Sequence, residues 1–62
     1  MTLSGKRALI TGSFQGIGLG IATSLAAEGA AIVLHGLADE ATIAKAEEAV
    51  MAAGAAKVES YV

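Results

Sequence analysis

Cysteine, proline and tryptophan are all missing from these 62 residues, and phenylalanine and tyrosine occur once each. Without cysteine the chain has no disulfide, no thiolate nucleophile and no cysteine-ligated metal site, which is compatible with a reducing compartment. No apolar run approaches the length of about 20 residues that spans a membrane, and none resembles a secretory signal. We therefore expect a cytoplasmic protein with no membrane partner.

Basic residues are also few. The chain carries a net charge of −2, and its four basic side chains are scattered at positions 6, 7, 45 and 57. Such a distribution offers no basic patch to nucleic acid, so we expect no nucleic-acid partner. Hydrophobic residues make up 55% of the chain, and small ones dominate, which suits helices packed close to a sheet. A chain of this size is short for an independent domain, because it buries only about 60% of its unfolded surface.

Short apolar runs alternate with longer helical stretches. This pattern predicts strands at residues 7–11, 30–34 and 57–62, a helix at 16–28, and a second helix between an Asp39 N-cap and Gly54. Two helical crossovers imply a parallel sheet in which the strands lie in the order third, second, first. We therefore predict an α/β fold, namely one half of a Rossmann-type doubly wound parallel sheet, with residues 1–62 forming the incomplete N-terminal half of the domain.

Packing within these elements can also be predicted. Ile17, Ile21 and Leu25 recur every four residues in the first helix, with Ala22 and Ala26 beside them, and these positions are expected to form its apolar face. Gly20 lies inside that helix, where its use would be close approach to the sheet or to another helix. The first strand is continuously apolar at residues 8–10, as a strand buried on both faces would be, yet it lies at the edge of the predicted half-sheet.

The segment Thr11–Gly18 joins the first strand to the first helix and reads T-G-x-x-x-G-x-G. The Walker pattern fails because no Lys-Ser or Lys-Thr pair follows, and G-x-G-x-x-G fails at its third glycine. A helix N-terminus offers unpaired N–H groups and a positive dipole to an anion. Glycines at 12, 16 and 18 would remove the Cβ atoms that block a phosphate. The turn therefore predicts a site for the diphosphate of a dinucleotide.

This motif resembles the coenzyme-binding signature of the short-chain dehydrogenase/reductase family, and the resemblance covers the whole chain. The strings at residues 5–13, 16–22 and 32–36 are similar to bacterial 3-hydroxybutyrate dehydrogenases, whose members usually have asparagine where His35 stands. A 3-oxoacyl-carrier-protein reductase is the other subgroup considered. The resemblance implies cofactor contacts at seven positions of this chain: Gly12, Phe14, Gln15, Gly16, Ile17, Gly18 and Leu37.

The same resemblance places the catalytic Asn, Ser, Tyr and Lys in later segments, so we expect no catalytic residue and no metal ligand here. Tyr61 in particular has no lysine four residues after it, and we interpret Ser60 and Tyr61 as strand residues. His35 could bind adenine or ribose, although a lone histidine at a strand end is more often a loop residue.

NAD is the expected cofactor and NADP the alternative. A 2′-phosphate usually needs an arginine or lysine near the end of the second strand or in the turn, where Gln15, Gly36 and Leu37 stand. The acidic residue that commonly binds the ribose diol is also missing from positions 36 and 37. Asp39 could reach the ribose, but its role as a helix N-cap is favoured.

The resemblance thus implies an oxidoreductase, homo-oligomeric when full length, that transfers hydride between NAD and a small hydroxy or keto acid such as 3-hydroxybutyrate. Two alternatives stay open. One is an NADP-dependent 3-oxoacyl-carrier-protein reductase, and the other is a nucleotide-binding fragment without chemistry of its own.

Overall fold

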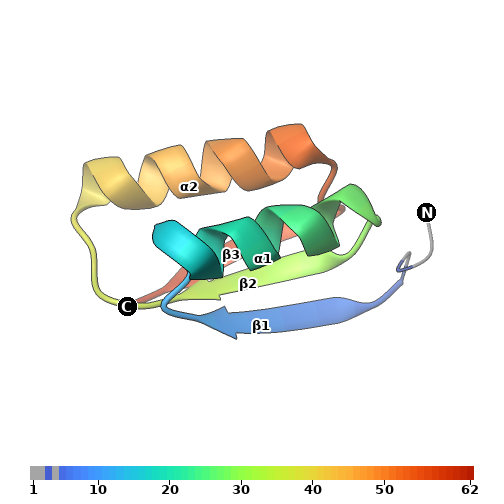
Figure 1. Cartoon of the computed structure of the whole chain (residues 1–62), viewed down its shortest axis with the longest axis horizontal. Helices are drawn as coiled ribbons and strands as arrows, with labels where there is room; N and C mark the ends of the chain where they lie inside the picture. The colour runs from blue at the N-terminus through green and yellow to red at the C-terminus, as the bar shows by residue number, and fades with distance from the viewer. Residues whose placement is uncertain (1–2, 4) are drawn as a thin grey trace.

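A three-stranded parallel sheet carries two helices on one of its faces (Figure 1). The computed structural model describes residue 3 and residues 5–62. In chain order the elements are β1 (Arg7–Thr11), α1 (Gly16–Ala27), β2 (Ala31–His35), α2 (Glu40–Ala53) and β3 (Lys57–Tyr61). The sheet order is β1-β2-β3 and both pairs are parallel. The predicted α/β class and strand order are therefore confirmed.

The core lies between the central strand and the two helices. Ile32 and Leu34 of β2 are buried on the side that faces the helices, and Val50 of α2 is fully buried against them. Each such side chain contributes about 1.5–3 kcal/mol by leaving water. From α1 the core receives Ala22 and Ala26, both fully buried. Alanines let a helix lie close to the sheet, so this small core depends on close approach as well as on large side chains.

The apolar face predicted for α1 is buried only in part. Ile17 is 85% exposed and Ile21 is 48% exposed, whereas Ala22 and Ala26 are fully buried. Successive residues of a helix point about 100° apart, so Ala22 points in a different direction from Ile21, the residue before it. Leu25 is partly buried and packs against the core as well, so the inward face of α1 includes the two alanines and Leu25 but not Ile17.

Close approach occurs at a different glycine from the one predicted. A Cβ placed on Gly20 would meet no heavy atom within 4 Å. On Gly54, at the end of α2, it would lie 3.1 Å from the carbonyl oxygen of Ala26. The ends of the two helices therefore approach at Gly54, and Gly20 faces open space.

The helices cover only one face of the sheet, so the apolar residues of β1, a type typical of a strand buried on both faces, are buried on one face alone, at the predicted sheet edge. Leu9 is 65% exposed, although Ile10, which faces the helices, is buried. On the face without helices, Leu9 lines a shallow depression of about 310 Å³ together with Arg7 and Val33. We call this side the open sheet face.

A small polar network crosses the open sheet face above β2. The guanidinium of Arg7 lies 3.2 Å from Glu59 Oε1 on the far strand, and the hydroxyl of Tyr61 donates to Glu59 Oε2 at 3.0 Å. That hydrogen bond to a carboxylate raises the pKa of Tyr61. Ser60 points to the other side and donates to Glu47 of α2 at 2.6 Å. Ser60 and Tyr61 are strand residues, as predicted.

Asp39 caps α2, as its position predicts. Its Oδ1 accepts a hydrogen bond from the backbone N–H of Thr42 at 2.8 Å. The other end of the helix stops at Gly54, whose φ of 121° is unfavourable for residues with a side chain. Neither α1 nor α2, the helices found in the described residues, is long and apolar enough to cross a membrane.

Replacing Asp39 by alanine is expected to lower the melting temperature at neutral pH, because the N–H of Thr42 loses its partner. The hydrogen bond from Thr42 lowers the pKa of Asp39 below its ordinary value of 3.8. The carboxylate's contribution is therefore complete above pH 3.8 and disappears as the pH falls through the lowered pKa. Circular-dichroism melts across this pH range should show that the difference in melting temperature between wild type and Asp39→Ala becomes smaller in acid. Asp39→Asn, an equally good neutral cap, should not show this pH dependence, and a gap independent of pH would contradict the assignment.

Candidate functional site

The glycine turn lies between the end of β1 and the start of α1, at the carboxyl edge of the sheet (Figure 1). Because the strands are parallel, the ends of β1 and β2 meet at this edge, and α2 also begins there. Ligands of open α/β sheets bind outside the carboxyl ends of the strands. The turn therefore occupies the edge at which this architecture places a ligand.

Gly12 and Gly16 leave the space over the turn open. Both have φ of 62°, a left-handed conformation that residues with side chains rarely adopt. A Cβ placed on either would meet no heavy atom within 4 Å. These two positions thus expose their backbone to solvent, and a side chain at either would fill the open space over the turn.

Gly18 is required for a different reason from the one the motif suggested. A Cβ on this residue would overlap the carbonyl oxygen of Gly12 and lie 2.9 Å from the Cα of Ser13. The first turn of α1 therefore packs directly on the backbone that leaves β1. Glycine at this position keeps the turn closed and does not itself open a path for phosphate.

The N-terminus of α1 is not capped by its own side chains. Gln15 is the N-cap residue and has an extended backbone, yet its side chain makes no capping hydrogen bond, and no acidic residue lies in the first turn. In contrast, α2 has the Asp39 cap and Glu40 in its first turn. Of the two helix N-termini at this edge, that of α1 has neither a side-chain cap nor an acidic residue, so its N–H groups and dipole are the more available to an external anion.

The other predicted contact residues differ in what they can offer. Phe14 is only 4% exposed and its ring lies in the core. Its side chain is therefore inaccessible, and a contact with a cofactor could come only from its backbone. Ile17 and Leu37, at 85% and 88% exposure, present their side chains to solvent. Gln15 is exposed as well.

The loop after β2 packs against the turn. A Cβ on Gly36 would lie 3.3 Å from the ring of Phe14 and 3.4 Å from the Cα of Gly12. This contact brings Leu37, which follows, to the same edge as the glycines. It also leaves little room for an acidic side chain at position 36, where one would otherwise bind a ribose diol.

Sequence reasoning missed Ser13, the one buried polar residue among those described. Its Oγ accepts a hydrogen bond from the N–H of His35 at 2.9 Å and donates to the carbonyl of His35 at 3.4 Å. The N–H of Ser13 donates to the same carbonyl at 3.1 Å. No pattern in the sequence indicates this contact, because 22 positions separate the two residues. The imidazole of His35 itself is exposed.

A family model described as short chain dehydrogenase matches residues 6–61. The D-beta-hydroxybutyrate dehydrogenase of Cupriavidus necator is 62% identical over 45 residues, which is 73% of this chain and 17% of that protein. The chain thus spans about a sixth of the length of this curated relative.

Two solved structures have the same fold over nearly all of the chain. A 3-oxoacyl (acyl-carrier-protein) reductase from Agrobacterium tumefaciens C58 with NADP bound has a TM-score of 0.81 and 37% identity, covering 95% of this chain and 22% of that one. A short chain dehydrogenase from Mycobacterium paratuberculosis bound to NAD has a TM-score of 0.86 and 27% identity, covering 100% of this chain and 27% of that one. With a family model matching almost every residue and these structures sharing its fold, the chain belongs to the short chain dehydrogenase family.

Proposed function

We propose that residues 1–62 are the N-terminal half of the dinucleotide-binding domain of an oxidoreductase, and that the glycine turn holds the cofactor diphosphate. The observation that carries this proposal is the open space over Gly12 and Gly16 at the uncapped start of α1. In this assignment the residues that line the diphosphate and the adenosine ribose are Gly12, Phe14 (through its backbone), Gln15, Gly16 and Ile17. Gly18 holds the turn closed, and Leu37 flanks the adenine.

The proposed reaction is oxidation of a small hydroxy acid, with 3-hydroxybutyrate as the substrate. Support comes from the Cupriavidus necator relative, which is named a D-beta-hydroxybutyrate dehydrogenase. A bound nicotinamide would accept the hydride. This chain's own part is to orient the cofactor from its adenosine side, since no residue in it is assigned to catalysis and the proton-transfer groups belong to further parts of the protein.

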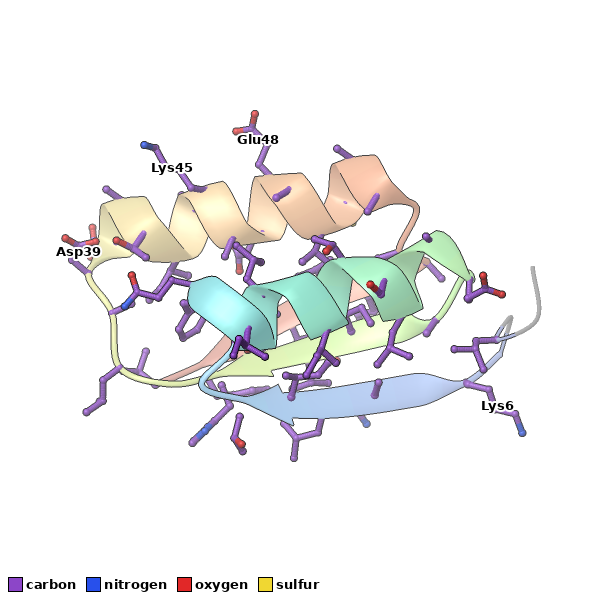
Figure 2. The ribbon with its side chains drawn as sticks, in the orientation of Figure 1. Lys6, Asp39, Lys45 and Glu48 are labelled. Carbon is purple, nitrogen blue, oxygen red and sulfur yellow. The ribbon has the colours of Figure 1, made fainter. Side chains whose placement is uncertain are left out.

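NAD is proposed over NADP because of where the basic side chains lie. Arg7 and Lys57 stand in register at the amino ends of their strands, where Lys6 also lies, opposite the carboxyl edge. Figure 2 shows Lys6 at the far end of the molecule from Asp39, and Lys45 pointing away from the sheet. None of the four basic residues of the chain is therefore at the turn to bind a 2′-phosphate.

The second candidate is an NADP-dependent 3-oxoacyl-carrier-protein reductase. It is favoured by the fold similarity to the Agrobacterium tumefaciens reductase, whose structure has NADP bound. In that case the cation for the 2′-phosphate would come from outside residues 1–62.

These candidates can be separated in the protein encoded by the complete reading frame. Calorimetric titration is expected to give tighter binding of NAD than of NADP, and 3-hydroxybutyrate should be oxidised with NAD. Gly16→Val should weaken NAD binding at least about tenfold, because the new side chain fills the space proposed for the diphosphate and valine is strained at a φ of 62°.

Tighter NADP binding with turnover of a 3-oxoacyl thioester would support the reductase instead. NAD binding without any turnover would favour a nucleotide-binding protein that lacks chemistry of its own. Unchanged NAD affinity in Gly16→Val would overturn the assignment of the turn.

A further inference from the structure

Ser13 joins the two segments that the proposed function assigns to the cofactor. One is the glycine turn after β1, and the other is the loop that begins after His35 and contains Leu37. The regular pairing of β1 with β2 ends at Thr11 and His35. Beyond that pair the two segments of the backbone separate. The residues after Thr11 form the glycine turn, and the residues after His35 lead toward α2. The hydrogen bonds of Ser13 lie just past this point.

The side chain of Ser13 satisfies both backbone groups of one residue. It accepts from the N–H of His35 at 2.9 Å and donates to its carbonyl at 3.4 Å, while its own N–H donates to that carbonyl at 3.1 Å. A hydroxyl can donate and accept at once, and serine is small enough to do so while 0% exposed. These hydrogen bonds connect the glycine turn to the end of β2, two residues beyond the last paired residue of β1.

We propose that Ser13 is a positioning residue for the cofactor: it sets the distance between the glycine turn and the loop at Leu37, and therefore between the diphosphate and adenosine subsites. This inference rests on the proposed function. Because the hydroxyl is fully buried, it touches no ligand and acts only through the backbone of His35. Gly36, the next residue along, packs on Phe14 and Gly12 of the same turn.

Ser13→Ala tests the inference. It keeps the Cβ and removes the hydroxyl, so the N–H and carbonyl of His35 lose the hydrogen bonds that Ser13 Oγ makes with them in a part-buried setting. With the protein encoded by the complete reading frame, calorimetry should show ADP binding about tenfold weaker with the number of sites per chain unchanged, a loss equal to about 1.4 kcal/mol. ADP is the probe because it carries both the diphosphate and the adenosine. Ser13→Cys, with a weaker donor and acceptor of similar shape, should give an intermediate loss.

Thr23→Ala is the matched control. It also removes one hydroxyl, which donates to the carbonyl of Gly20 within α1 at 3.0 Å, and ADP affinity should stay within about twofold of wild type. Wild-type affinity in Ser13→Ala would overturn the proposal. So would fewer binding sites with an unchanged dissociation constant, because that result means partial unfolding. If Ser13→Ala does not fold, Ser13→Cys becomes the test: weaker ADP binding supports the proposal, and wild-type ADP affinity overturns it. A wild-type protein that binds neither ADP nor dinucleotide refutes the proposed function itself.

Discussion

Gly18→Ala is expected to weaken dinucleotide binding about a hundredfold or more, although it adds a single methyl group. The new Cβ would overlap the carbonyl oxygen of Gly12 and press on the Cα of Ser13. Both are backbone atoms that no side-chain rotation can move, so the turn itself must open. Overpacking of this kind costs about 1–3 kcal/mol of folding stability. A shifted turn would also displace the backbone of Gly12 and Gly16 in the proposed diphosphate site, and each factor of ten in affinity corresponds to about 1.4 kcal/mol.

Gly20→Ala provides the control for this prediction, because it is the same substitution two positions further along the same helix. No heavy atom lies within 4 Å of its added Cβ, and alanine is favoured over glycine inside a helix by about 1 kcal/mol. Thermal melts should therefore give Gly20→Ala a melting temperature equal to or above that of the wild type, and its affinity for NAD should be unchanged. If Gly18→Ala binds NAD as wild type does, the close contact between the start of α1 and Gly12 is not what holds the turn.

Local signals explain why the secondary structure could be predicted almost to the residue. Asp39 and Gly54 mark the ends of α2 by their own hydrogen-bonding and conformational preferences, and both act as predicted. Gly29 likewise ends α1 with a φ of 88° and a hydrogen bond to Ala26 at 2.8 Å. Each of these signals operates within a few residues along the chain, and sequence spacing captures such effects well.

Features that depend on distant residues could not be predicted in this way. The exposed isoleucines of α1 and the buried alanines beside them reflect how closely the helix lies on the sheet, which periodicity does not encode. Ser13 finds its partner 22 positions away, and Gly18 is constrained by the carbonyl of Gly12, across the turn. The motif thus locates the turn but does not distinguish glycines that leave space for a ligand from a glycine that packs inside the protein.

The 62 residues produced as a separate chain are expected to self-associate. β1 lies at the edge of the sheet with one strand neighbour, so part of its backbone hydrogen-bonding capacity is left for another chain. Leu9, 65% exposed, lies on the open sheet face beside the depression that it lines with Arg7 and Val33. An unpaired edge next to an apolar surface favours pairing with a second copy. Sedimentation velocity should accordingly show species larger than the monomer, increasing with protein concentration.

Leu9→Lys should suppress this association, because burying the leucine supplies about 1.5–3 kcal/mol and an edge lysine opposes pairing, so the dissociation constant should rise at least about tenfold. Met51→Lys is the matched control: Met51 is 52% exposed, but it lies on α2, which packs against α1 and β3 and not against β1. Its association should match that of the unmodified chain. A cooperatively melting monomer at every concentration would contradict the prediction, since it would mean that two helices on one face suffice to protect both the edge and the open sheet face.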